Sequence, residues 1–314
     1  GYELSEATRG VLKRAGVPYV DIWLHPVRFL DDVLFAFGTN EESIWRGLKG
    51  FHLKDGVCWS YADRLKIGLY KGWKRPELKL EEGSALFVGQ TLQDKAVCRD
   101  GRMLTVVDFE GEFKELCATH KKVYYSRHPF VKSGDEDVLA FLKKFPNVEL
   151  TSANAYYLLA SSEVKTVMSV SSSVVLEARY FGKKTRVLYR PVVDFGVGAV
   201  GQYCAVYQAF ISPHFWAGIL KGVIAGGVKG DAEVIGYLDG KDKLRDMLAF
   251  YWSYGAIDKV EGSRQQLLAV DNKVQKLAKA VEAPVSVVVA PEGAGGPMVE
   301  YVEEAQWYRD IEVQ

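Results

Sequence analysis

The sequence predicts an α/β fold whose sheet is parallel and covered by helices on both faces. Three observations lead to this prediction. From residue 84 to about residue 190, short apolar segments of strand length alternate with segments of helical periodicity. The strand segments are apolar at nearly every position, as expected of strands buried on both faces. In the helical segment 135–145 the acidic residues come first and the lysines last, which suits the helix dipole.

The elements of this region follow one another at short intervals, as βα units do. Its predicted strands are 84–90, 122–126, 148–150, 164–170 and 184–189. Its predicted helices are 106–120, 135–145, 152–162 and 172–182, the third capped by Ser152 and the last ended by Gly182. This order favours a sheet with a crossover helix between each pair of strands.

The regions before and after these βα units have a different pattern of predicted secondary structure. Residues 18–25 predict a strand, and residues 40–51 predict a helix with Asn40 as its N-cap. The polar segment 71–85 is interrupted by Pro and marks a boundary. Aromatic-rich helical patterns at 205–220 and 240–256 and an amphipathic helix at 263–281 follow the βα region. The predicted organisation is an N-terminal domain at 1–82, a Rossmann-like domain at 83–204, and helices in 205–314 that complete the first domain.

The composition is that of an ordinary globular protein. Of the 314 residues, 48% are hydrophobic and 25% are charged, and the formal net charge is zero, which argues against nucleic-acid binding by bulk positive charge. The four cysteines form no CxxC pair, so neither a disulfide framework nor a zinc site is expected, and a cytoplasmic location fits best. No apolar run is long enough to span a membrane, and the opening residues are not a secretory signal. The abrupt start indicates a module of a longer protein.

Polar residues follow three of the predicted strands at their carboxyl ends, where open parallel sheets bind ligands. The three groups are Gln90–Asp94, Ser126–Pro129 and Ser169–Ser173. We expect all three to line one crevice.

The serine group lies where a strand passes into a helix. Backbone N–H groups, hydroxyls and the helix dipole at such a turn can hold a phosphate, and Glu177 one turn later could hold ribose hydroxyls. The alternative is structural: Ser171 or Ser172 caps the helix, and Glu177 completes a capping box. The GxGxxG match at Gly196–Gly201 does not directly join a predicted strand to a helix, and the chain has no Walker lysine motif, so the sequence only weakly supports binding of a dinucleotide or of ATP.

The other candidates are single residues with ordinary structural alternatives. His128, held by Pro129, could donate a hydrogen bond to a phosphate, and Arg127 could contact an anion; the alternatives are a satisfied loop histidine and a solvated arginine. Asp94 could attack an anomeric carbon or merely cap a turn.

A second His-Pro pair stands near the start of the chain. Asp21, His25 and Arg28 could bind a hydroxylated acceptor. The adjacent Asp31 and Asp32 fit an exposed helix edge better than a metal–nucleotide site.

Five motifs together resemble a known family. They are "IWLHPVRFLDDVLFAF", "GQTLQD", "YYSRHP", "SVSSSVVLEA" and "ISPHFWAGIL". Their order and spacing resemble the CMP-sugar-using transferases, and most of all the retaining β-Kdo transferase module of glycosyltransferase family 99, which caps O-antigen chains. The resemblance spans about residues 20–256. The aromatic-Gly-Glu-Ala turn of the capsule Kdo transferases is absent here, where Val174–Ala178 reads "VVLEA", so the capsule branch matches less well.

The resemblance implies a GT-B fold, with two Rossmann-like domains, each with a parallel sheet, an active-site cleft between them, and C-terminal helices crossing back to the first domain. It implies transfer of Kdo from CMP-Kdo with retention, through a covalent intermediate on Asp94. It implies CMP binding by the matching residues His128, Pro129, Ser171, Ser172, Ser173 and Glu177, with His128 also catalytic. Arg127, beside His128, joins the nucleotide-binding candidates from its position in the sequence. The first domain is expected on the acceptor side, where Asp21, His25 and Arg28 are the acceptor-binding candidates named above.

The implied partners are a CMP-sugar donor and a lipid-linked glycan acceptor of lipopolysaccharide biosynthesis, at the cytoplasmic side of the inner membrane. No metal or other cofactor is implied, because a CMP leaving group carries one phosphate. Two rival hypotheses remain. One is an inverting transferase for CMP-sialic acid or another nucleotide sugar, and the other is a GT-B-like scaffold without catalysis.

Overall fold

The computed structural model describes residues 1–71, 78–91, 95–99, 101–224 and 244 of the 314. Backbone contacts divide the chain into two units, Gly1–Leu267 and Leu268–Gln314, and the second lies wholly outside the described residues. The helices expected at 240–256 and 263–281 lie outside them too, apart from Leu244. All elements named below belong to the first unit.

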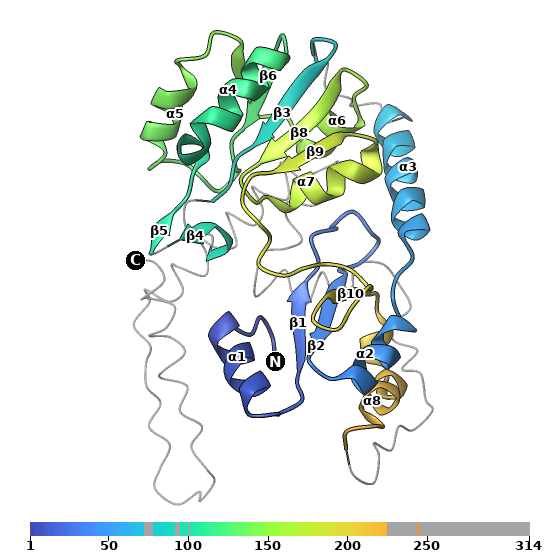
Figure 1. Ribbon diagram of the computed structural model, residues 1–314. Helices are drawn as coiled ribbons and strands as arrows, with labels where there is room; N and C mark the ends of the chain where they lie inside the picture. The colour runs from blue at the N-terminus through green and yellow to red at the C-terminus, as the bar shows by residue number, and fades with distance from the viewer. Residues whose placement is uncertain (72–77, 92–94, 100, 225–243, 245–314) are drawn as a thin grey trace, which may run out of the picture. The chain divides into compact units, whose positions relative to one another are not determined.

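A five-stranded parallel sheet is the largest element of the fold (Figure 1). Its strands are β3 (Ser84–Val88), β6 (Val123–Ser126), β7 (Val148–Thr151), β8 (Val164–Ser169) and β9 (Lys184–Val187). They lie in the order β7-β6-β3-β8-β9, and each neighbouring pair is parallel. The predicted α/β fold with a parallel sheet is therefore confirmed.

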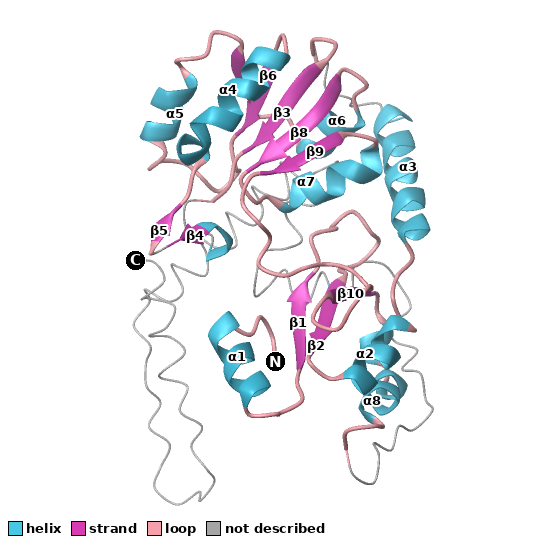
Figure 2. Cartoon of the chain, in the orientation of Figure 1, coloured by secondary structure: helices cyan, strands magenta, loops and turns pink. Residues whose placement is uncertain are grey.

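Helices cover both faces of this sheet (Figure 2). They are α4 (Glu110–Thr119), α5 (Glu136–Leu142), α6 (Ala155–Ala160) and α7 (Ser173–Ala178). Successive residues of a strand point to opposite faces, so Ala85 and Phe87 pack with α4 and α5, while Leu86 and Val88 pack with α6 and α7. The continuous apolar run of β3 follows from this double burial.

A second sheet is antiparallel. It consists of β1 (Val20–Leu24), β2 (Phe35–Thr39) and β10 (Tyr203–Val206), in the order β1-β2-β10. A second parallel sheet was expected, and the described residues contain none. The start of the helix expected at 205–220 is also wrong, because β10 pairs with β2 and all four of its residues are buried.

Several helices surround these sheets. They are α1 (Glu6–Arg14), α2 (Glu42–Lys49), α3 (Asp55–Lys71) and α8 (Pro213–Leu220). α8 packs against α2 through Phe215 and Ile219. The cap of α2 is Glu41 rather than the expected Asn40, whose side chain instead binds the backbone of Val17 and Tyr19. Within the described ranges, each helix is too short or too polar to span a lipid bilayer.

The remaining elements are short. A two-stranded hairpin joins β4 (Cys98–Arg99) to β5 (Arg102–Met103). The 3₁₀ helices are η1 (Lys95–Val97), η2 (Val106–Phe109), η3 (Arg179–Phe181) and η4 (Ala209–Ile211). The helix predicted at 106–120 thus begins as η2 and continues as α4, and the Thr105–Asp108 capping box starts it.

The segment between β1 and β2 packs on the α6–α7 side of the parallel sheet. Phe29 meets the rings of Tyr156, Tyr180 and Phe181 edge-on, at centroid distances of 6.5, 5.8 and 5.6 Å. Edge-to-face contacts of this kind add to the apolar burial of the rings. The second His-Pro segment therefore lies beside the helix that follows the serine group.

Candidate functional site

The strand order places a topological switch point beside β3. From β3 the chain adds β6 and β7 on one side, and it then crosses to add β8 and β9 on the other. Open α/β sheets bind ligands in the crevice that this reversal creates at the carboxyl ends of the strands. The loops after β3 and β8 flank this crevice.

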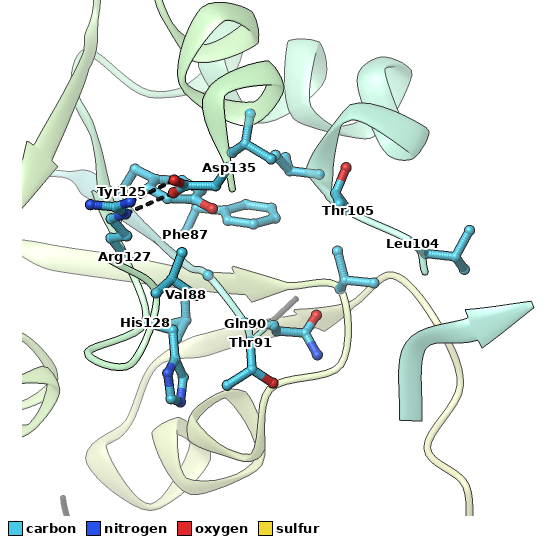
Figure 3. Close-up of a pocket in the computed structure, with 15 residues that line it drawn as sticks. Phe87, Val88, Gln90, Thr91, Leu104, Thr105, Tyr125, Arg127, His128 and Asp135 are labelled. Carbon is cyan, nitrogen blue, oxygen red and sulfur yellow. Dashed lines mark hydrogen bonds and ion pairs between the residues drawn. The ribbon is translucent and has the colours of Figure 1, made fainter. Parts of the chain in front are cut away.

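A narrow cavity lies at this place (Figure 3). Gln90 and Thr91 follow β3, Arg127 and His128 follow β6, and Val170 follows β8; all five line the cavity. Loops from all three strand ends therefore reach one cavity, although only Val170 of the serine group lines it and Asp94 lies outside the described residues. The enclosed volume of about 30 Å³ accommodates one or two water molecules, or a group of similar size.

One wall of the cavity comes from a segment that the sequence did not point to. Leu104, Thr105 and Val106, between β5 and α4, line it opposite the strand ends. The signal that could have placed this wall is the Thr105–Asp108 capping box, in which Thr105 accepts from the N–H of Val107 and Asp108 accepts from the N–H of Thr105. A segment fixed in this way can serve as a rigid wall.

Arg127 is held by an acidic partner inside the cavity wall. Its Nε donates to Asp135 Oδ2 at 2.7 Å and its Nη2 donates to Asp135 Oδ1 at 2.5 Å, a bidentate pair that Figure 3 shows as dashed lines. The carboxylate of Asp135 is only 5% exposed. Its hydrogen bonds raise the pKa of Arg127 above the usual value. Asp135 was not predicted as a site residue, because only the folded chain brings it to Arg127.

His128 is oriented by the turn that it begins. Its Nδ1 accepts the backbone N–H of Phe130 at 3.2 Å, its carbonyl accepts the N–H of Val131 at 3.0 Å, and Pro129 stands at the second position of the turn. Because Nδ1 accepts a hydrogen bond, a neutral imidazole carries its proton on Nε2, which is then the nitrogen able to donate to an anion. Figure 3 shows the ring on the side away from the Arg127 ion pair.

The serine group is tied to the loop after β3. The N–H of Ser171 donates to Gln90 Oε1 at 3.0 Å, and the N–H of Ser172 donates to Ser169 Oγ at 3.1 Å. Ser172 caps α7 by accepting the N–H of Val174 at 3.4 Å, so the structural alternative holds for Ser172. In the described part of the chain, Gln90 Nε2 is buried and has no hydrogen-bond partner. An amide donor in this state is suited to a ligand in the crevice.

Glu177 is buried in the helix layer and completes no capping box. It is 2% exposed; its Oε1 accepts the N–H of Arg28 at 2.6 Å and the hydroxyl of Tyr156 at 3.0 Å. It therefore links the second His-Pro segment to α6 and α7. In this arrangement the carboxylate faces protein donors, so holding ribose hydroxyls would require exchange of these partners.

Two of the predicted acceptor-binding residues are buried in the structure. Asp21 is 0% exposed and accepts from Tyr203 Oη at 2.6 Å and from Trp23 Nε1 at 2.9 Å. His25 is 9% exposed, and burial, followed by the charge of Arg28, lowers its pKa to about 3. A role for Asp21, His25 and Arg28 in acceptor binding stays a prediction, and these contacts give Asp21 and His25 structural roles.

The remaining candidates are three aspartates, Asp31, Asp32 and Asp94. Asp94 lies outside the described residues, so its role stays a prediction. Asp31 and Asp32 lie on no helix, contrary to expectation; Asp31 accepts from Tyr61 Oη at 2.9 Å, and Asp32 is buried. Among the residues that the structure describes, no three His, Cys or acidic side chains gather closely enough to hold a metal ion.

Comparisons with known proteins give little beyond these observations. No protein-family profile matches the chain, and no curated protein matches it. Among solved structures, the chain is similar to the β-Kdo 2,7 transferase KpsC of Thermosulfurimonas dismutans, with 15% identity, a TM-score of 0.36, and coverage of 61% of this chain and 68% of that one. The β-Kdo 2,4 transferase KpsC of the same organism gives 16%, 0.36, 64% and 73%. At these TM-scores the likeness is too loose to carry over an activity.

Proposed function

We propose that the chain is a glycosyltransferase whose crevice at the ends of β3, β6 and β8 binds the CMP part of a CMP-Kdo donor. The observation that carries this proposal is the convergence of three strand-end loops on one cavity beside the switch point. The His-Pro and serine motifs, whose order resembles that of CMP-sugar transferases, lie on two of these loops. The motifs and the crevice are independent observations that point to the same place.

The donor phosphate is proposed to lie at the mouth of the cavity, because its enclosed part is too small for a nucleotide. The Nε2–H of His128 and the buried Nε2 of Gln90 are the donors proposed to hold phosphate or cytosine oxygens. Arg127 acts as a positioning residue in this proposal, since Asp135 occupies its fork. Hydrogen bonds from fixed donors would stabilise the negative charge that develops on the departing CMP.

The proposed chemistry is a double displacement. The carboxylate of Asp94 attacks the anomeric carbon of Kdo, the bond from that carbon to the phosphate oxygen breaks, and its electron pair leaves with CMP. An acceptor hydroxyl then attacks the same carbon and gives its proton to solvent, while the bond from that carbon to Asp94 breaks and its electron pair leaves with the carboxylate. Two inversions give net retention. This step rests on the motif resemblance, which places Asp94 shortly after β3 and before the His-Pro pair.

A nucleotide panel tests donor binding. We expect CMP to raise the melting temperature, while UDP, ADP and NAD do not; a ligand at a hundred times its dissociation constant stabilises a protein by about 2.7 kcal/mol. His128→Ala should weaken the CMP effect. His214→Ala, at an exposed histidine on α8, is the matched control and should leave it unchanged. No response to CMP, or an equal response to every nucleotide, would refute a CMP-specific crevice.

Asp94→Asn separates an enzyme from a scaffold. The variant should bind CMP as the wild type does and lose transfer, because the carboxamide is a poor nucleophile. Intact mass spectrometry of the wild type after incubation with donor should show a Kdo adduct on Asp94. An adduct elsewhere, or an inverted product, would overturn the assignment of Asp94. Absence of transfer in the wild type, with CMP binding intact, would favour the scaffold.

A further inference from the structure

A second and larger cavity lies apart from the crevice. It is formed by the segment 190–195 after β9, by Gly201 and Tyr203 at β10, and by Arg9 on α1, and it shares no lining residue with the first cavity. Its volume of about 520 Å³ falls in the range typical of small-molecule sites. None of the motifs singled out in the sequence accounts for it.

Two arginines line this cavity. Arg9 donates from Nη1 to Tyr203 Oη at 2.6 Å, and its side chain is 18% exposed. Arg190 is exposed and, within the described ranges, makes no hydrogen bond or ion pair. A guanidinium carries five N–H donors in a planar fork that suits a carboxylate or a phosphate. The cavity can therefore offer charge-assisted hydrogen bonds to an anionic group.

Asp21 compensates part of the charge of Arg9, because Asp21 Oδ2 lies 4.0 Å from Arg9 Nη1 in an ion pair. Asp21 is 0% exposed and does not line the cavity, and its carboxylate also accepts from Leu4 N, Trp23 Nε1 and Tyr203 Oη, so Arg190 carries the more open positive charge. Asp194 is exposed and accepts from Gln202 Nε2 at 2.9 Å. A cavity lined by two guanidinium groups and the Asp194 carboxylate suits a ligand that carries both an anionic group and hydroxyls. The Asp194 carboxylate would repel an anion that has no hydroxyls to donate to it.

An aromatic wall completes the cavity. Phe195 is half-buried and pairs with Tyr203 in a β-bridge, where Tyr203 N donates to Asp194 O at 2.8 Å and Gly196 N donates to Tyr203 O at 3.0 Å. These bonds fix the wall to the edge of the antiparallel sheet. Phe195 lines the cavity, while its ring also packs edge-on against His25 at a centroid distance of 5.1 Å, and its side chain offers an apolar surface for the C–H face of a sugar.

From this combination we propose that the second cavity binds an acidic saccharide, with Arg9 and Arg190 on its carboxylate, Asp194 on its hydroxyls and Phe195 against its ring. The role of this cavity as the site of the glycan acceptor rests on the proposed glycosyltransferase function, and it names the class of that acceptor. It moves acceptor recognition from the buried Asp21 and His25 to an open cavity.

Calorimetric titration with glucuronic acid, glucose and inorganic phosphate tests this proposal. Glucuronic acid should bind, glucose should bind at least about ten-fold more weakly, because it lacks the charge-assisted hydrogen bonds, and higher salt should weaken glucuronate binding. Arg190→Gln should weaken glucuronate binding by about ten-fold, the loss expected for one such bond. Arg14→Gln, in the last turn of α1 and outside the cavity, is the matched control and should change nothing.

Three outcomes would overturn the proposal: no glucuronate binding, equal binding of glucuronate and glucose, or an unchanged affinity in Arg190→Gln. Phosphate that binds as tightly as glucuronate and displaces it would also overturn it, since the site would then recognise a bare anion. A CMP titration of the same variants separates the two proposals. CMP binding without glucuronate binding contradicts only the second cavity, and glucuronate binding without CMP binding contradicts only the nucleotide crevice.

Discussion

Acidification should destabilise the folded chain through the buried imidazole of His25. Its side chain is 9% exposed, and its Nδ1 accepts the N–H of Val27 at 3.1 Å. Burial, and then the positive charges of Arg28, Arg179 and His52, lower the pKa of His25 from 6.5 to about 3. The folded state therefore keeps the ring neutral at pH values where the unfolded chain binds a proton. This contribution to stability is complete above pH 6.5 and is lost as the pH falls from there toward 3.

The magnitude follows from the two pKa values. Between pH 7 and pH 5 the unfolded state gains about 2 kcal/mol relative to the folded state from this one proton. That is a sizeable part of the net stability of a typical domain, which is about 5–15 kcal/mol. Other groups also titrate in this range, so the effect of His25 has to be isolated by a substitution.

His25→Asn provides the comparison. The asparagine oxygen can accept the N–H of Val27, and the side chain does not titrate. Urea unfolding at pH 7, 6 and 5 should show the wild type losing about 2 kcal/mol more than the variant over this range. Parallel pH profiles for the two proteins would show that His25 is not held neutral by burial, and the reasoning would fail.

Three further substitutions probe the crevice and its supports. Gly89→Ala should destabilise the fold by about 1–3 kcal/mol in chemical denaturation, because a Cβ there would lie 2.8 Å from Tyr125 Oη; an unchanged stability would mean that the loop after β3 adapts freely. Glu177→Ala should cost about 2–3 kcal/mol by the same measurement, because the part-buried N–H of Arg28 and the buried hydroxyl of Tyr156 lose this acceptor; a cost near zero would refute its role as a link between segments. Arg127→Lys should lower the melting temperature, since lysine cannot make two parallel bonds to Asp135, and an equal melting temperature would show that the bidentate geometry does not matter.

The parallel sheet could be predicted because its signals are local. The strand β3 is apolar from Ala85 to Val88, and the helix that becomes α5 carries acidic residues in its first turn. The residues that indicate each strand and the helix after it therefore lie within about twenty positions of one another, a length over which periodicity is informative.

The antiparallel sheet could not be predicted in the same way. The predicted helical segment 205–220 begins with the last two residues of β10, and these residues form a strand because β2, far earlier in the chain, pairs with them. Asn40 has the residue type of a helix cap, yet its side chain bonds to Val17 and Tyr19 instead. In both cases a tertiary contact outweighs the local preference.

The candidate site likewise has features that the sequence predicts and features that only the folded chain shows. The positions of Gln90, His128 and the serine group follow from the rule that parallel strands end at one edge. The partners that fix them do not: the ion pair of Arg127 with Asp135 and the bond from Arg28 N to Glu177 join residues whose spacing carries no motif. The sequence could therefore locate the crevice without showing which of its side chains remain open to a ligand.

The decisive experiment for a nucleotide site at the ends of β3, β6 and β8 is mapping of backbone amide shifts by NMR during a titration with CMP. We expect the largest changes on three segments, Gly89–Thr91, Arg127–His128 and Val170–Ser172, and little change at the amides of Asp194 and Phe195. Changes concentrated around Asp194 and Phe195, or scattered without the three strand ends, would contradict a nucleotide crevice at the carboxyl edge of the parallel sheet.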